Sequence, residues 1–378
     1  MEEATTYKLG DISTMKYGKL PPKYINEGNY PIWSGYRYVG KCNEFNCNKG
    51  DIIIVARGVG GTGDVKIAKE DCYLTNLSIQ VKLDKNICQP EYFYYSYLLS
   101  NLKYLDSGSA QSQITIEDLK RLEVTLPPLE QQHKITDILK SIDEKIELNR
   151  QINDNLEQQA QALYKSWFVD FEPFKDGEFI ESELGKIPEG WQCIPFSMFV
   201  SESKAKTGKI GIKEYSVTNN GIFPRDAKYN KSLSQSSTKN KLILYGDLVF
   251  GMSRDILNWG VMQEEQGGVS SAYTVYNINS GIVNSTYLEL FIKSRIHLFS
   301  DLIRPAAREG QGIDKSVLQT KVLLYPPHEV LDTFWPLYDS VTNQIQTTTT
   351  EINCLGDVRD TLLPKLMSGE LKINEIDC

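Results

Sequence analysis

The sequence is poor in the residues on which metal centres and histidine-based catalysis depend. Its 378 residues include only three histidines and seven cysteines. The two closest cysteines, Cys42 and Cys47, do not have the Cys-x-x-Cys spacing of zinc sites. We therefore expect no metal site and no histidine-based chemistry in this chain, and we interpret the cysteines as buried or idle thiols.

Long hydrophobic runs are absent as well. No apolar stretch approaches the ~18 residues that a membrane-spanning helix needs, and the N-terminal MEEATTYKLG does not resemble a signal peptide. We expect a cytoplasmic protein that has no membrane contact. The GxxxxGK[S/T] motif of P-loop ATPases is also missing.

One glycine-rich motif does occur. Residues 58–63 match GxGxxG after an apolar run, and Asp84 lies further along the chain. A dinucleotide site of this type needs a helix directly after the glycines, whereas residues 64–81 have a strand-like pattern. A glycine loop between strands explains the motif equally well. Asp51 and Asp247 each follow a glycine, and we interpret them as strand-start or turn residues rather than a catalytic pair.

The most informative stretch contains neither proline nor glycine. It follows Pro127 and Pro128 and extends to Trp167, and apolar residues recur along it every three or four positions. This heptad stripe predicts a helix of about 60 Å that packs against another helix. The predicted packing face contains Ile135, Leu139, Ile142, Ile146, Asn149, Leu156 and Leu163.

The partner helix lies in the same chain, because the stripe returns 199 positions later behind Pro326 and Pro327. In an antiparallel pair, Asn149 and Asn153 would face Thr348 and Ile352, and this polar layer would fix the register of the helices. The predicted packing face of the second helix contains Phe334, Tyr338, Val341, Ile345, Ile352, Leu355 and Leu362.

The segments that precede the two helices share landmarks in the same order. KGDIIIVARGVGG corresponds to LYGDLVFGMSRD, and the predicted helix at residues 90–105 corresponds to that at residues 285–299. We predict an α+β protein with two α/β-type globular domains, two long helices packed as an antiparallel coiled coil, and a pseudo-two-fold internal repeat. The expected division is a first globular domain at 1–126, a central helix at 127–170, a connector at 171–190, a second globular domain at 191–325 and a C-terminal helix at 326–378.

The net charge of −8 is distributed unevenly. Residues 7–126 carry 15 Lys and Arg against 13 Asp and Glu, and residues 191–325 carry 16 against 11, so the two domains are mildly basic. The two helical segments carry the acidic excess. Because phosphate binding depends on local charge, this distribution permits nucleic-acid binding by the domains.

Cationic and amide side chains, with one tryptophan, occur on predicted loops of both domains. Arg and Gln can recognise base edges, and Lys contacts phosphates. Each such residue alone could equally be a solvated surface residue, and the doubled architecture favours a shared role. The candidate DNA-binding residues are Arg57, Gln111, Gln113, Lys204, Lys206, Lys209, Arg254, Trp259, Arg308 and Gln311.

The layout resembles that of the specificity subunits of type I restriction-modification systems, over nearly the whole chain. The clearest signatures are LPPLEQQHKITDILKSIDEKIELNRQINDNLEQQAQALYKSWFVDFEPF and the following ESELGKIPEGW. One departure is that the first domain begins without a copy of the GKIPEGW lead.

The resemblance implies that the two globular domains are target-recognition domains. Each would read one half of a bipartite double-stranded DNA target in the major groove, and the helix pair would set the gap between the halves. The chain itself would have no active site and no cofactor. It would recruit two modification subunits, which methylate adenine with S-adenosylmethionine, and restriction (translocase) subunits, which use ATP and Mg²⁺. We expect the acidic outer faces of the helices to contact these partners.

Two alternatives belong to other functional classes. One is a coiled-coil scaffold that joins two domains binding ligands other than DNA, and the other is an enzyme that uses the GxGxxG loop. A salt-dependent DNA affinity would distinguish the DNA reader from the scaffold.

Overall fold

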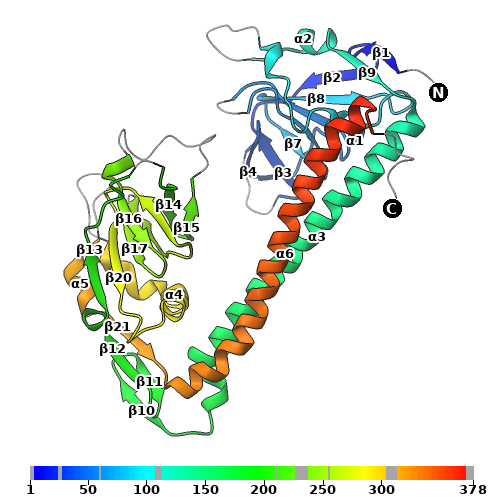
Figure 1. Ribbon diagram of the computed structural model, residues 1–378. Coiled ribbons are helices and arrows are strands. Elements are labelled where there is room, and N and C mark those ends of the chain that lie inside the picture. The colour runs from blue at the N-terminus through cyan, green and yellow to red at the C-terminus, as the bar shows by residue number, and fades with distance from the viewer. Residues whose placement is uncertain are drawn as a thin grey trace. The chain divides into compact units, whose positions relative to one another are not determined.

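The computed structural model describes residues 4–23, 28–58, 61–106, 113–209, 211–225, 237–253, 256–303 and 313–371. Contacts divide the chain into two compact units. Unit 1 comprises Met1–Asp154 and Ile345–Cys378, and unit 2 comprises Asn155–Gln344. Each long helix (Figure 1) therefore contributes one part to each unit, and the five-segment division stays a prediction.

The described strands of unit 1 are β1 (Thr5–Lys8), β2 (Ser13–Tyr17), β3 (Tyr30–Ser34), β4 (Arg37–Cys42), β5 (Ile52–Val55), β6 (Val65–Ile67), β7 (Tyr73–Leu74), β8 (Ser78–Leu83) and β9 (Glu123–Leu126). They form sheets of order β2-β8-β5-β6, β4-β3-β7 and β1-β9. Strands β3 and β7 pair in parallel, and the other pairs are antiparallel.

The core of unit 1 forms around β5. This strand consists of four β-branched residues and is fully buried, as expected for a central strand that is covered on both faces. Helix α1 (Pro90–Ser96) buries Tyr92 and Phe93 in the same core, and a short 3₁₀ helix, η1, spans Lys103–Leu105.

Helix α2 (Ile116–Lys120) begins at a capping box formed by Thr115 and Asp118. The Thr115 hydroxyl accepts a hydrogen bond from the Asp118 backbone N–H at 3.2 Å, and the Asp118 carboxylate accepts one from the Thr115 N–H at 2.9 Å. Two backbone donors at the helix N-terminus are satisfied in this way.

Helix α1 is shorter than predicted. It ends at Ser96 instead of reaching residue 105, and Leu99 is 51% exposed. The chain leaves the helix because the Leu102 N–H donates to the Gly63 carbonyl at 2.9 Å, so this segment pairs with the glycine loop instead of continuing a helix. Leu102 is buried in the hydrophobic core of unit 1.

The described strands of unit 2 are β10 (Phe179–Ser182), β11 (Gly185–Pro188), β12 (Gln192–Pro195), β13 (Val200–Ser203), β14 (Tyr215–Thr218), β15 (Gly221–Pro224), β16 (Lys241–Leu244), β17 (Leu248–Ser253), β18 (Ile256–Val261), β19 (Gln266–Val269), β20 (Thr274–Ile278) and β21 (Val322–Tyr325). Its helices are α4 (Ser285–Ser294) and α5 (Lys315–Thr320), with 3₁₀ turns η2 (Glu172–Phe174), η3 (Phe196–Met198), η4 (Ser237–Lys239) and η5 (Ile296–Leu302).

Unit 2 repeats the element order of unit 1. Its four-stranded sheet has the order β13-β20-β17-β18, which corresponds strand by strand to β2-β8-β5-β6. Strands β12 and β21 pair as β1 and β9 do, and α4 and α5 follow the sheet as α1 and α2 do. The internal repeat that the sequence predicts is therefore confirmed in the order and pairing of the elements.

The two long helices are α3 (Leu129–Phe168) and α6 (His328–Ser368). In unit 1 the two helices run antiparallel, as three side-chain contacts between them show. Asn153 Nδ2 donates to Thr349 Oγ1 at 3.0 Å, Lys145 forms an ion pair with Glu351, and Asp143 forms one with Arg359. The α+β fold with an antiparallel coiled coil is thus confirmed.

Each predicted packing residue of the helices is buried or half-buried. In the region of the predicted polar layer, Asn153 donates to Thr349, the neighbour of Thr348. Asn149 is 1% exposed.

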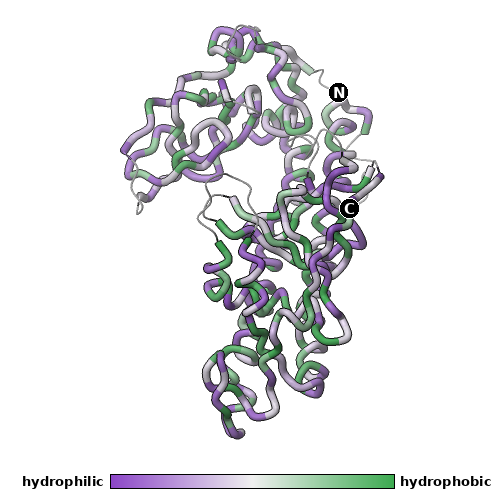
Figure 2. The backbone as a smooth tube through the Cα atoms, turned by 90° about the vertical axis from the view of Figure 1, so that its left-hand side faces the viewer, coloured by the Kyte–Doolittle hydropathy of each residue, from purple (hydrophilic) through white to green (hydrophobic). Residues whose placement is uncertain are grey.

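Figure 2 shows hydrophobic and hydrophilic residues mixed along the chain. A helix that packs through one apolar face has such a mixture, because its other faces are polar. No helix within the described ranges is long and apolar enough to cross a membrane.

Candidate nucleic-acid interface

The glycine loop of unit 1 connects strands, as the sequence predicts. The segment after the loop enters β6, and no helix begins there in the described residues 61–89. Gly63 has a φ of +92°, and a Cβ on it would lie 2.4 Å from the Lys103 backbone nitrogen. Glycine is thus required for backbone conformation and close packing, and the loop lacks the helix N-terminus on which a dinucleotide site depends.

Arg57 and Gln113 lie close together in unit 1. Arg57 follows β5 and donates from Nη2 to the Asn76 carbonyl at 3.3 Å. The Ile114 N–H donates to the Ala56 carbonyl at 2.9 Å, which holds Gln113 beside the end of β5. Both candidate side chains are half-buried, so their exposed parts contribute to one edge of the unit.

The β3–β4 hairpin reaches the same edge. Its two-residue loop, Gly35 and Tyr36, lies between the paired residues Ser34 and Arg37. A Cβ on Gly35 would lie 3.6 Å from the Arg57 carbonyl oxygen, so the loop packs beside Arg57. Sequence analysis missed this hairpin as a candidate site, although a glycine between apolar and aromatic residues is a turn signal.

A second cation supports the hairpin from β6. Lys66 Nζ lies 6.0 Å from the centre of the Trp33 ring and donates to the Tyr36 carbonyl at 3.4 Å. Burial lowers the pKa of Lys66, and the nearby Asp64 carboxylate partly opposes that shift. Asp64 is the acidic group that faces this cation.

In unit 2, Lys204, Lys206 and Lys209 are all exposed. They lie on the segment after β13, which is held by a hydrogen bond from the Thr207 N–H to the Asn240 carbonyl at 3.0 Å. In the described part of the chain none of the three forms a salt bridge. This segment therefore presents three solvated ammonium groups, a suitable surface for phosphate.

Trp259 corrects one expectation. We expected it on a loop, but it lies in β18 opposite Phe250 and is 5% exposed within the core. The reason is the two-residue alternation of the strand, which directs its indole into the sheet core. Trp259 therefore presents no exposed face to a ligand.

Four further candidates lie outside the described residues. They are Gln111, Arg254, Arg308 and Gln311.

Asp51 and Asp247 have equivalent structural roles. The Asp51 carboxylate accepts from the Asn48 N–H at 3.1 Å, and that of Asp247 accepts from the Leu244 N–H at 2.8 Å. Each closes the turn that precedes a central strand, as predicted. Burial raises the pKa of Asp247, while its hydrogen bonds to Leu244 and Asn277 oppose that shift.

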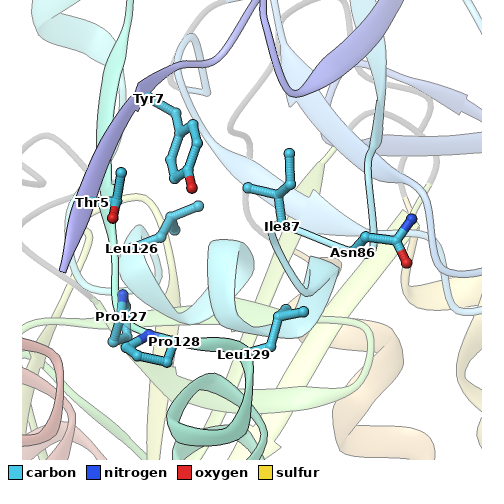
Figure 3. Close-up of a pocket in the computed structure, with 8 residues that line it drawn as sticks. All are labelled: Thr5, Tyr7, Asn86, Ile87, Leu126, Pro127, Pro128 and Leu129. Atoms are coloured by element: carbon cyan, nitrogen blue, oxygen red, sulfur yellow. The ribbon is translucent and has the colours of Figure 1, made fainter. Parts of the chain in front are cut away.

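A cavity of about 370 Å³ lies where α3 begins. Thr5, Tyr7, Asn86, Ile87, Leu126, Pro127, Pro128 and Leu129 line it (Figure 3).

The two units differ in packing at the position of Leu126, one of the residues that line the cavity. At the position equivalent to Leu126, unit 2 carries Tyr325, whose ring lies 5.2 Å from that of Tyr287. The hydroxyl of Tyr325 accepts from the Asn284 N–H at 3.4 Å. We interpret the cavity as space that a leucine leaves where the other unit has a tyrosine.

Comparison with known proteins shows to which proteins this chain is similar. Residues 1–158 match the family model of the type I restriction modification DNA specificity domain. The type I restriction enzyme MjaIX specificity subunit of Methanocaldococcus jannaschii is 28% identical over 373 residues, which cover 93% of this chain and 84% of that protein. Over most of its length the chain is therefore similar to the specificity subunits of type I restriction-modification systems.

Two further specificity subunits are similar to this chain. The HindI specificity subunit of Haemophilus influenzae is 42% identical over 113 residues, covering 28% of this chain and 24% of that protein. The crystal structure of a type I restriction-modification S subunit from M. genitalium has a TM-score of 0.54 and 16% identity, and the match covers 96% of each chain. This last likeness supports the fold of the specificity subunit.

Proposed function

We propose that this chain is a type I specificity subunit that reads a bipartite double-stranded DNA target, one half with each unit. The observation that carries the proposal is the repeated unit. Two copies of one strand order present different loop residues at equivalent places. A protein with two equivalent DNA-binding units suits a target that consists of two half-sites, as twofold DNA-binding proteins do.

The helix pair sets the gap between the half-sites in this proposal. An α-helix rises 1.5 Å per residue and is stiff, so a paired helix is a suitable spacer. The buried Asn149 and the Asn153–Thr349 hydrogen bond would hold one register of the pair and hence one spacing.

The subunit is proposed to be non-catalytic and to act through partners. Two modification subunits would methylate adenine with S-adenosylmethionine, and restriction (translocase) subunits would use ATP and Mg²⁺. The exposed carboxylates of α3 support a partner surface. Among the residues that the structure describes, Glu144 and Glu147 pair only with neighbours on their own helix, Lys140 and Arg150, at 3.7 Å each.

The decisive experiment is methylation mapping in a host that carries the full chain and its modification subunits. We expect one methylated motif with two defined parts and a fixed gap. Exchanging residues 191–325 for those of another specificity subunit should change one part only. A continuous motif, or one that changes in both parts, would contradict the two-unit reading.

The partner surface is tested separately. Charge reversal at Glu144, Glu147 and Glu157 should impair assembly with the modification subunits and leave half-site preference intact. Glu181→Lys is the matched control, because Glu181 is exposed on β10, outside the long helices. Equal loss of assembly in the control would contradict a surface on α3.

The coiled-coil scaffold remains the competing function. It predicts no DNA affinity, or an affinity without salt dependence. For the proposed reader, affinity should fall steeply as salt concentration rises, because bound cations are released from the phosphates.

A further inference from the structure

The β3–β4 hairpin of unit 1 has a counterpart in unit 2. Strand β3 pairs in parallel with β7, and the hairpin β14–β15 joins β19 through a parallel bridge between Glu214 and Gly268. Strands β7 and β19 occupy the same place in the element order of the two units. The two hairpins are therefore equivalent elements.

Both hairpins also pack on the equivalent edge strand. In unit 1, Lys66 of β6 donates to the Tyr36 carbonyl. In unit 2, a Cβ on Gly260 of β18 would lie 3.0 Å from the Ile222 backbone nitrogen. In unit 1 the Lys66 side chain makes the contact with the hairpin, and in unit 2 the backbone of Gly260 makes it directly.

The hairpin tip of unit 1 presents an ordered guanidinium group. Arg37 Nε donates to the Tyr36 hydroxyl at 2.9 Å, and the guanidinium carbon lies 5.1 Å from the centre of the Tyr36 ring. Its Nη1 and Nη2 atoms have no acceptor within the described part of the chain. Arg37 thus uses its Nε donor within the protein and keeps its two Nη groups available to a ligand. Arg37 is exposed, and the neighbouring Tyr38 is 53% exposed.

The tip is held rigidly at its base. A Cβ on Gly61 would lie 2.7 Å from Tyr36 Cδ1, so the Tyr36 ring rests directly on that glycine. Gly35 has a φ of +62°, a conformation in which a side chain would be strained. An arginine stacked on a fixed ring loses little conformational freedom when it binds a planar acceptor.

The corresponding tip of unit 2 has different chemistry. Its loop consists of Asn219 and Asn220, both exposed. The backbone N–H of Asn220 donates to the side-chain hydroxyl of Thr218 at 3.1 Å, and this hydrogen bond closes the turn. Within the described residues the two side-chain amides make no hydrogen bond, so they are available to a ligand.

We propose that the tips of hairpins β3–β4 and β14–β15 are base-reading elements, one for each half of the DNA target. Arg37 takes a guanine in one half-site, and the Asn219–Asn220 tip takes an adenine in the other. The inference rests on the proposed function and adds Arg37, Asn219 and Asn220 to the candidate DNA-binding residues.

The chemistry of the major groove supports these assignments. Guanine presents two acceptors, O6 and N7, that match the paired Nη donors of arginine. Adenine presents an acceptor and a donor, N7 and N6–H, that match the amide of asparagine. Lys204, Lys206 and Lys209 are single point charges and suit the phosphates, which position a protein without specifying sequence.

The experiment uses the full chain assembled with its modification subunits. Duplexes of random sequence are selected by binding, and the preferred bases are determined by sequencing. Arg37→Ala should abolish the preference for guanine at one position of one half-site and weaken binding to the selected duplex roughly 5- to 100-fold. The double substitution Asn219→Ala and Asn220→Ala should act on the other half-site alone.

Two controls separate base reading from charge. Arg37→Lys keeps the charge and loses the planar fork, so it should also relax the guanine preference while keeping the salt dependence. Lys82→Ala removes an exposed charge from β8, at the end of that strand remote from Leu77, which packs beside Gly35. This control should leave every base preference unchanged.

The outcomes are distinguishable. If Arg37→Ala weakens binding to all sequences equally, or changes nothing, the hairpin tip does not read a base and the inference is wrong. If the wild-type complex itself selects no sequence, the proposed function fails first. Thermal unfolding of each variant shows that the exposed substitutions leave the fold intact.

Discussion

The two units use different physical chemistry where their domains meet the helix pair. In unit 1 aliphatic side chains of the helices, such as Leu139 and Leu363, join the domain core. Beside them lies a polar contact, in which the Tyr95 hydroxyl donates to Asp143 at 2.8 Å and Arg359 donates to the same carboxylate at 2.8 Å. In unit 2 the junction is a cluster of aromatic rings, with Phe168 and Phe334 4.6 Å apart and both fully buried.

This difference separates stability from register. Apolar contacts depend on buried area and tolerate small displacements, whereas hydrogen bonds and ion pairs require one geometry. We infer that unit 2 supplies more of the folding free energy of the helix pair, and that unit 1 supplies more of its alignment. The following predictions test that division, from the largest expected effect to the smallest.

Removing a ring from the aromatic cluster should have the largest effect. Phe168→Ala deletes a fully buried side chain that packs on Phe334 and Tyr287, and we expect a loss of about 3–5 kcal/mol in the free energy of unfolding. Urea unfolding measures the loss. A loss below about 1 kcal/mol would show that the cluster is not the main source of stability.

Breaking the polar junction should cost less. Arg359→Met leaves Asp143 with its bond from Tyr95, and since the Arg359 and Asp143 side chains are 22% and 29% exposed, water partly replaces the lost partner. We expect a loss of about 1–3 kcal/mol that shrinks in high salt. A double-mutant cycle with Asp143→Asn isolates the pair, and a coupling energy of zero would contradict its role.

Asn149→Leu should stabilise the protein. Asn149 Nδ2 is buried and has no hydrogen-bond partner among the described residues, so replacing the amide removes an unmet polar group. We expect a gain on the order of 1–2 kcal/mol together with looser register. The thermal midpoint reports the gain, and methylation mapping reports the gap between the half-sites. If neither changes, Asn149 has no part in the register.

Glu289 makes the stability of unit 2 depend on pH. Burial raises its pKa to about 7, and its carboxylate accepts from Gln263 Nε2 at 2.6 Å. Because the folded pKa exceeds the unfolded value near 4.5, the contribution is complete below that value and is lost as pH rises towards 7.

Glu289→Gln should therefore remove this slope. The variant should be more stable than the wild type above pH 7, by an amount on the order of 1 kcal/mol. Unfolding in urea from pH 4.5 to 8 tests the difference. Parallel pH profiles for the variant and the wild type would contradict the assignment.

The smallest effect is expected at the exposed ion pair of the helices. Lys145 and Glu351 lie 3.4 Å apart and are 47% and 45% exposed, so Lys145→Ala should cost about 0.2–1 kcal/mol. The same urea experiment at low and high salt measures it. A cost comparable with that of Arg359→Met would show that exposure does not separate the two pairs.

The sequence predicted the helix pair well because its signals are local and periodic. The heptad stripe and the 199-residue offset identified both helices, and the Asn153 contact lies one residue from the expected partner. The capping box at Thr115 was predictable for the same reason, since three neighbouring residues determine it.

The parts that we propose to contact DNA were less predictable because they depend on distant contacts. The equivalence of the two hairpins appears in their parallel pairing to β7 and β19, which are far from them in sequence. Trp259 was placed wrongly because the chain returns as a strand directly after the turn and buries the indole. Helix α1 ended early because Leu102 binds the glycine loop, a partner far from it in sequence.

The two-residue hairpin loops have a consequence for how such a protein could acquire new targets. Arg37, Asn219 and Asn220 are exposed and none belongs to a hydrophobic core cluster. Substitutions at these positions should therefore alter the preferred sequence with little penalty in folding. A lineage could retarget one half of its recognition sequence by a single codon change while the other half and the subunit contacts stay as they are.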